Sequence, residues 1–148
     1  MKKTNELEKR ANRANLKYRK EKKALIQKVP TPILYTRKGL IAQQSTVDYT
    51  GIIAPNGQGI AFDAKETKNK TSFPLKNIHQ HQLNFLNLFE ELGGIAFFLI
   101  HFKSIYENKA FKTPLSVVNR YRDGEERKSI PFDDFKENWL VPIDSYLK

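Results

Sequence analysis

The sequence predicts an α/β fold in a single domain that spans residues 1–148. Two stretches, near the N-terminus and around residues 80–92, place apolar side chains at helical spacing. Strand-like segments lie between and after them, and residues 95–102 are an almost wholly apolar run of strand length. Such a run is typical of a central strand covered on both faces. A length of 148 residues suits one domain with its own core.

The N-terminal segment from Thr4 to Lys23 is predicted to be a basic amphipathic helix. Thr4 suits the N-cap, and the opposite side of the helix is rich in lysine and arginine. Apolar side chains recur at spacings of three and four, at Leu7, Ala11, Ala14 and Tyr18.

A short strand, Ala24 to Val29, follows this helix. Pro30-Thr31-Pro32 ends it, because proline donates no backbone hydrogen bond. The segment Ile33 to Gln44 contains Arg37-Lys38-Gly39 and is expected to form a hairpin-like excursion or a protruding loop. We therefore expect a stalk-like protrusion at about residues 31–44.

A β-hairpin is predicted next. Its first strand is Ser45 to Ile53 and its second is Gly59 to Lys65, where apolar and polar residues alternate. The turn cluster Pro55-Asn56-Gly57-Gln58-Gly59 joins them. The lysine-rich segment Lys65 to Ser72 is expected to be a surface loop.

The C-terminal half predicts a helix, a central strand and a mixed tail. The helix starts near Leu75 to Ile78 and ends at Leu92, before Gly93-Gly94. The central strand is Ile95 to Phe102. The tail is expected to contain a helix capped by Thr113-Pro114, an edge strand over Arg127 to Ile130, a helical turn over Pro131 to Lys136 and a packed segment over Trp139 to Ile143.

The composition restricts the function. The net charge is +10, from 26 Lys and Arg against 16 Asp and Glu, which favours a polyanionic partner such as nucleic acid. A lysine-rich proteome would give the same charge without a partner. The absence of cysteine excludes disulfides, thiolate metal ligands and a cysteine nucleophile. No apolar run is long enough to span a bilayer, and no apolar segment follows the basic N-terminus, so we expect a cytoplasmic protein.

The predicted hairpin carries an acid on each arm. Asp48 and Asp63 come roughly opposite each other, and Lys65 projects from the same face as Asp63 because the two are two residues apart. Two carboxylates suit Mg²⁺, and a nearby lysine suits the charge of a phosphate under attack. The spacing alone fits a surface ion pair equally well. The apolar neighbours Tyr49 and Phe62 favour a partly buried cleft.

Several strings also resemble RecU-type Holliday junction resolvases, in order from about Leu7 to Ile130. The two central strings carry most of the resemblance, and Asp63 stands where the family pattern has Glu. The strings are Lys28-Val29-Pro30-Thr31-Pro32, Ser45-Thr46-Val47-Asp48-Tyr49-Thr50-Gly51, Phe62-Asp63-Ala64-Lys65-Glu66-Thr67-Lys68, Ser72-Phe73-Pro74-Leu75, His81-Gln82 and Arg127-Lys128-Ser129-Ile130.

The resemblance implies a restriction-endonuclease-like PD-(D/E)xK fold, with a central mixed β-sheet flanked by helices, and a homodimer that nicks four-way junctions. By position, Asp48, Asp63 and Glu8 match the metal-binding acids and Lys65 the catalytic lysine, with Mg²⁺ as cofactor and Mn²⁺ as a substitute. Thr46 and Gln82 are expected to support the site. Contacts to DNA are expected from Arg13, Lys17, Arg37, Lys38, Lys68 and Lys70.

The predicted function is therefore a magnesium-dependent endonuclease that resolves Holliday junctions in recombination and repair. The Ile33 to Gln44 segment is short beside the family's stalk, which bears on junction selectivity. Two alternatives stay open at this point. One is a restriction-like or repair nuclease without junction preference, and the other is a non-catalytic DNA-binding protein of the same fold.

Overall fold

A six-stranded mixed sheet forms the centre of the computed structural model, which describes residues 5–30, 33–42, 46–124 and 128–148. β5 and β7 are parallel neighbours in the middle, and every other pair in this sheet is antiparallel. In spatial order the strands are β1 (Ala24–Lys28), β4 (Tyr49–Ile53), β5 (Gln58–Thr67), β7 (Ile95–Phe102), β8 (Lys109–Pro114) and β10 (Leu140–Pro142). The predicted α/β class and the central mixed sheet are confirmed.

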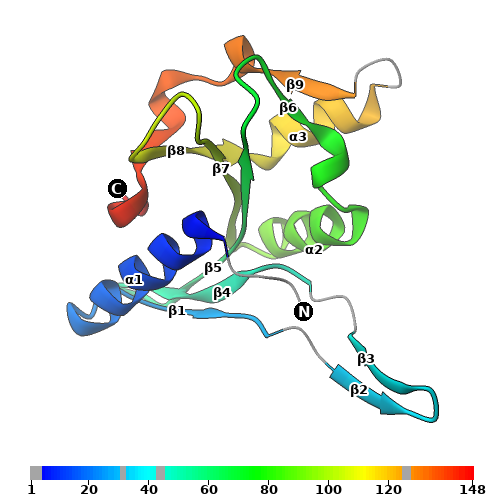
Figure 1. The fold of residues 1–148 in the computed structure, drawn as a ribbon. Helices are drawn as coiled ribbons and strands as arrows, with labels where there is room; N and C mark the ends of the chain where they lie inside the picture. The colour runs from blue at the N-terminus through cyan, green and yellow to red at the C-terminus, as the bar shows by residue number, and fades with distance from the viewer. Residues whose placement is uncertain (1–4, 31–32, 43–45, 125–127) are drawn as a thin grey trace.

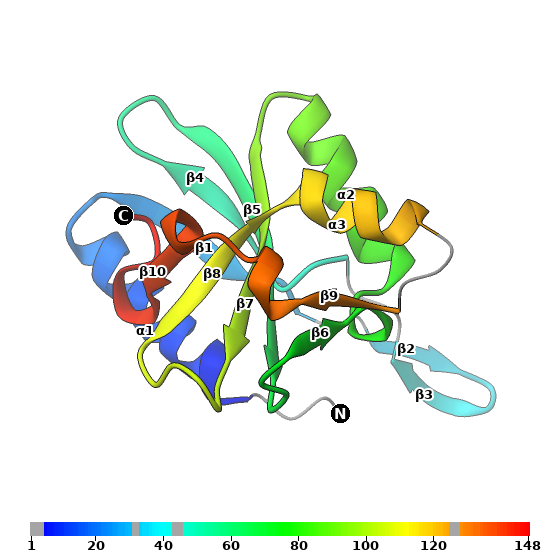
Figure 2. The same cartoon turned by 90° about the horizontal axis from the view of Figure 1, so that it is seen from above.

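Helices cover both faces of this sheet. α1 (Glu6–Lys20) lies on one face, and α2 (Gln80–Glu91) and α3 (Leu115–Asp123) lie on the other, as Figures 1 and 2 show from two directions. The arrangement agrees with the restriction-endonuclease-like fold that the sequence predicted. None of the helices in the described ranges is long and apolar enough to cross a membrane.

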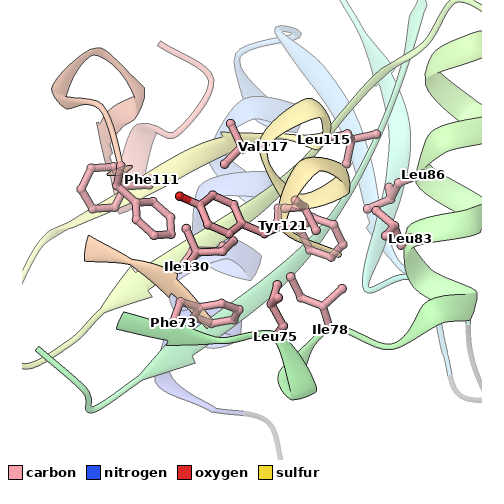
Figure 3. Close-up of a cluster of buried hydrophobic side chains, with 14 of the residues drawn as sticks. Phe73, Leu75, Ile78, Leu83, Leu86, Phe111, Leu115, Val117, Tyr121 and Ile130 are labelled. Carbon is pink, nitrogen blue, oxygen red and sulfur yellow. The ribbon is translucent and has the colours of Figure 1, made fainter. Parts of the chain in front are cut away.

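The two faces hold separate hydrophobic cores. The α1 core joins the buried side of α1 to aromatic rings of the sheet, such as Tyr49, Phe62 and Phe97, and to Tyr146 near the C-terminus. The α2–α3 core joins α2 and α3 to the opposite side of the sheet. Its side chains converge from the two helices and from the segments around Phe73 and Ile130 (Figure 3).

The first helix begins and ends inside the predicted limits. Asn5, and not Thr4, is the N-cap: its side chain accepts a hydrogen bond from the backbone N–H of Glu8, whose carboxylate accepts one from the N–H of Asn5. This reciprocal pair is a capping box. The helix ends at Lys20 because Lys22 adopts a left-handed φ of 58° and turns the chain into β1. Thr4 lies outside the described residues.

The β4–β5 hairpin forms as predicted, with different limits. β4 begins at Tyr49, and the predicted start at Ser45 lies outside the described residues. β5 continues to Thr67, so the prediction of a loop from Lys65 was wrong for its first residues. The cause lies in the neighbouring strand: β7 pairs with β5 in parallel through Thr67 opposite Phe102, and this pairing keeps the lysine-rich end extended.

Two small sheets lie beside the main one. The predicted excursion forms a hairpin of β2 (Ile33–Thr36) and β3 (Gly39–Ala42), which points away from the rest of the chain in Figure 1. β6 (Ser72–Pro74) pairs with β9 (Ser129–Pro131). The predicted strand up to Ile130 is therefore real, although Arg127 lies outside the described residues.

The remaining elements are short. The chain before α2 forms the 3₁₀ turn η1 (Leu75–Asn77), so α2 begins later than predicted. The helical turn predicted after Pro131 is confirmed as η2 (Phe132–Asp134). No pattern in the sequence predicted β8. The tail over Trp139 to Ile143 contains an edge strand, β10, between the turns η3 (Glu137–Trp139) and η4 (Ile143–Ser145).

Candidate active site

Asp48 and Asp63 are joined across the start of the β4–β5 hairpin. Tyr49 pairs with Phe62, so Asp48, directly before β4, lies next to Asp63. Oδ1 of Asp63 accepts a hydrogen bond of 2.8 Å from the backbone N–H of Asp48, and Oδ2 of Asp48 accepts one of 3.0 Å from that of Ala64. Charge-assisted bonds of this kind fix both carboxylates against the backbone.

Lys65 reaches the same point from β5. Its Nζ lies 2.9 Å from Oδ2 of Asp63, as the two-residue spacing predicted. The side chain of Asp63 is fully buried, while that of Lys65 keeps 11% of its surface exposed. Ala61 belongs to the α2–α3 core and Phe62 to the α1 core, so the alternation of the strand turns Asp63 and Lys65 toward the α2 side.

Glu8 comes to the site from the other side of the sheet, on the first turn of α1. It is 1% exposed, although the sequence alone did not distinguish it from Glu6, which is exposed. Lys28 connects it to the hairpin: its Nζ lies 3.3 Å from Oε1 of Glu8 and 3.8 Å from Oδ1 of Asp48. Glu8 is therefore connected to Asp48 through Lys28, and Asp48 is connected to Asp63 and Lys65 through the hairpin.

Lys28 is a site residue that the sequence reasoning missed. It is the last residue of β1, and it pairs in register with Tyr49, directly after Asp48. Its signal in the sequence was the string that begins at Lys28, but no spacing rule connects that string to Asp48. Its ammonium also lies 5.3 Å from the ring centre of Tyr49.

The electrostatics of the site affect Tyr49. Burial raises the pKa of its phenol far above the ordinary value, and the negative charges of Glu8, Asp48 and Asp63 raise it further. The hydroxyl is therefore a permanent hydrogen-bond donor. Each of the buried carboxylates has a lysine ammonium close by, as expected where unpaired charge would be costly.

The donor set suits a hard divalent cation. Carboxylate oxygens are the ligands that Mg²⁺ prefers, and two of them, on Glu8 and Asp48, already share one cation, the Lys28 ammonium. In the described ranges no three Asp, Glu or His side chains are already gathered around one point for a metal ion. A metal ion held by these acids would take up the charge that the lysines now neutralise.

The two supporting residues have different surroundings. Gln82 is buried at the start of α2, where its Oε1 accepts a hydrogen bond from the backbone N–H of His79 and so caps the helix. Thr46 is exposed two residues before Asp48. Gln82 thus has a structural task, and its role toward the acids stays a prediction, as does that of Thr46.

The predicted DNA contacts are all on the surface, in three places. Arg37 and Lys38 form the turn of the β2–β3 hairpin, and Lys68 and Lys70 follow β5. The third place is the outer side of α1, where Arg13 lies 3.7 Å from Glu6 and Lys17 lies 4.0 Å from Glu21. Exposed pairs of this kind are weak and leave the cations available to phosphate.

Comparisons with known proteins identify the family of this chain. A family described as RecU, Recombination protein U, matches residues 2–146. Holliday junction resolvase RecU of Pediococcus pentosaceus is 36% identical over 96% of this chain and 79% of its own length. The proteins of the same name from Leuconostoc mesenteroides and Oceanobacillus iheyensis are 35% and 38% identical, over 94% and 93% of this chain and 72% and 76% of theirs. The chain belongs to the RecU family.

Proposed function

We propose that this chain is an endodeoxyribonuclease that resolves Holliday junctions in DNA recombination and repair. The observation that carries the proposal is the buried cluster of Asp48, Asp63 and Glu8 with Lys65 in a member of the RecU family. A protein that only bound DNA would gain nothing from burying three carboxylates, because they repel phosphate. The cluster therefore favours phosphodiester hydrolysis over binding alone.

The three acids would hold Mg²⁺, with Mn²⁺ as a substitute. Such a metal supplies Lewis-acid activation of the phosphate and lowers the pKa of a bound water. The backbone hydrogen bonds to Asp48 and Asp63 keep their carboxylates in fixed orientations, which avoids an entropic cost when the metal binds.

Lys65 would act on the phosphate itself. Its ammonium is the part of the site that combines a fixed position beside Asp63 with partial exposure to solvent. A cation placed in this way stabilises the negative charge that develops on the phosphoryl oxygens during attack. Lys28, on the opposite side of Asp48, would balance the charge of the acids while the metal is absent.

The surface supports a DNA substrate with a branch. The β2–β3 hairpin exposes Tyr35 and Leu40, and the ring of Tyr35 could stack on a base. Its turn exposes Arg37 and Lys38, whose charges could contact phosphates. A nuclease of linear duplex has no need for a protruding apolar hairpin. A homodimer would place two sites around a two-fold axis, which matches the symmetry of a four-way junction and allows paired cleavage.

The proposal is tested by metal-dependent cleavage of a labelled four-way junction and of a linear duplex with the same arm sequence. We expect Mg²⁺ and Mn²⁺ to support paired nicking of the junction, with little cutting of the duplex. Asp63→Ala should abolish cutting, and Asp133→Ala, an exposed aspartate of η2, should leave it unchanged.

Three results would contradict parts of the proposal. No metal-dependent cutting of either substrate overturns the nuclease, and equal cutting of both overturns only the junction preference. A single protomer in light scattering, with and without the junction, overturns the homodimer.

A further inference from the structure

A hydroxyl group joins the strand of one site acid to the helix of another. The Tyr49 hydroxyl lies 3.1 Å from the backbone carbonyl of Glu8 and 2.8 Å from Oδ1 of Asn12. Glu8 and Asn12 are four residues apart, so they belong to the same turn of α1. A phenol has one proton, which these two acceptors share. Tyr49 therefore holds the one helical turn that carries a site acid.

The other side of Tyr49 is fixed to the sheet. Its ring stacks on Phe62 with centres 4.8 Å apart and planes 19° apart, and Phe62 stacks on Phe97 at 4.9 Å and 6°. Tyr49 follows Asp48 directly and Phe62 precedes Asp63 directly. The two residues that place the hairpin acids thus form one rigid stack, and the Tyr49 hydroxyl extends from this stack to α1.

Glu8 needs such a connection more than the other acids do. Asp48 and Asp63 are fixed by backbone hydrogen bonds within one hairpin, whereas Glu8 is on a separate helix, 40 residues from Asp48. Lys28 attracts Glu8 and Asp48 alike, but its side chain is long and 35% exposed, so this ion pair does not fix the orientation of the helix.

We propose that Tyr49 is a positioning residue that holds Glu8 against Asp48 and Asp63 and so determines how tightly the site binds a divalent cation. This inference rests on the proposed function, because it takes these acids as the metal ligands. It adds a residue that acts through α1, since its hydroxyl bonds to the Glu8 carbonyl and to Asn12. Groups that orient metal ligands in this way commonly change metal affinity when they are removed.

The chain contains a matched control for this proposal. Tyr146 is also fully buried, and its hydroxyl also bonds to an asparagine of α1, Asn15. Asn15 is seven residues beyond Glu8, or about 10 Å along the helix at 1.5 Å per residue. Removal of either hydroxyl costs one α1 hydrogen bond in the α1 core, but of these two hydroxyls only that of Tyr49 bonds to the turn of Glu8. Arg10 also holds this turn, through Asp144, and it is unchanged in both variants.

The test compares the affinity for Mn²⁺ of Tyr49→Phe and Tyr146→Phe by calorimetric titration without DNA. We expect Tyr49→Phe to weaken Mn²⁺ binding by about ten-fold, as for other groups that orient metal ligands, and Tyr146→Phe to change it less than about two-fold. Urea midpoints should fall by similar amounts in both, since each loses one buried hydrogen bond. In a Glu8→Gln background, Tyr49→Phe should cause no further loss of Mn²⁺ affinity.

A second variant tests the same inference in case Tyr49→Phe folds poorly. Asn12→Ala removes one of the two acceptors at a part-buried position and leaves the aromatic stack intact, so it should weaken Mn²⁺ binding in the same direction by a smaller factor. Equal Mn²⁺ affinities in Tyr49→Phe and Tyr146→Phe, or in Asn12→Ala and wild type, would overturn this inference alone. Failure of the wild type to bind Mn²⁺, or binding that survives Asp63→Ala, would instead overturn the proposed function.

Discussion

The two faces of the central sheet contribute to the site in different ways. On the α2–α3 face, Asp63 and Lys65 are part of β5, so the pairing of the sheet determines their positions. On the α1 face, Glu8 belongs to a docked helix, whose placement depends on side-chain bonds such as Tyr49 to Asn12 and Tyr146 to Asn15. The side-chain bonds of α2 and α3, by contrast, hold these two helices to each other and to the segment around η1.

This difference shows what each kind of packing achieves. Apolar packing gives stability in proportion to the buried surface, but it allows a helix to shift or rotate slightly at low cost. Hydrogen bonds from buried side chains have a direction and so fix one orientation. Both faces have such bonds, but they join different elements. Asn87 of α2 bonds to Asn119 of α3, and Arg122 of α3 bonds to the carbonyls of Leu75 and Ile78. Only the bonds of α1, among those of the described helices, connect the helix of one site acid to the strand that follows another.

The largest expected effect comes from the strand-borne lysine. Lys65→Met keeps most of the apolar stem and removes the ammonium beside Asp63, so cleavage of a four-way junction should fall by about 100-fold or more. Single-turnover rates at saturating protein measure this effect. Junction affinity should change little, because the exposed cations lie elsewhere.

Lys103→Met is the control for Lys65→Met, because Lys103 also pairs with an acid, Glu66 at 3.0 Å, outside the acid cluster. It should cut the junction at the wild-type rate. A loss smaller than about three-fold in Lys65→Met would remove the lysine from the proposed chemistry and leave the acids to act without it.

An intermediate effect on Mn²⁺ affinity should distinguish the α1 core from the α2–α3 core. Leu86→Ala on α2 and Leu7→Ala on α1 each remove a fully buried side chain, and each should lower the free energy of unfolding by about 2–5 kcal/mol. Leu7 is next to Glu8, so only its removal should also weaken Mn²⁺ binding. Urea denaturation and metal titration give the two readouts, and equal loss of metal affinity in both variants would remove the distinction between the faces.

The smallest effect is a pH dependence on the α1 face. His101 is buried, and its Nε2 lies 2.7 Å from the carbonyl of Tyr106. Burial lowers the pKa of its imidazole, with Arg10 and Lys103 contributing in the same direction against the opposing effects of Tyr106 and Glu66. The imidazole therefore binds a proton more readily in the unfolded chain than in the folded one. The stability of the fold that depends on neutral His101 is complete above about pH 6.5 and is lost as the pH falls below it.

His101→Gln should make the melting temperature fall less between about pH 7.5 and 5.5 than it does in the wild type, since glutamine keeps a donor for the Tyr106 carbonyl and does not titrate. Thermal melts at matched ionic strength measure the difference. Parallel pH profiles for the two proteins would show that His101 does not contribute.

The sequence predicted what depends on local pattern. The β4–β5 hairpin, the convergence of Asp63 with Lys65 and the central strand β7 all follow from alternation, turn residues and apolar runs. Other strands have no such pattern. β8 contains Lys109, Lys112 and Pro114, and its place in the sheet comes from pairing with β7 and β10.

The helix-borne and edge-strand parts of the site were beyond local reasoning. Glu8 and Glu6 lie on the same helix and carry the same charge, and only the resemblance to a family identified Glu8 as the site residue. Lys28 approaches Asp48 because β1 pairs with β4 in one register, which no spacing within either strand reveals. Contacts between distant segments depend on tertiary packing, and this is where single-sequence reasoning is weakest.

The contacts between α1 and the segment around η4 bear on when the protein is assembled during its synthesis. Tyr146 bonds to Asn15 across 131 residues, and Arg10 bonds to Asp144 across 134. The first turn of α1 leaves the ribosome early, but these partners are made only near residue 144. We therefore expect the turn of Glu8 to reach its final position only after residue 144 has been made, so that the site is completed late in synthesis.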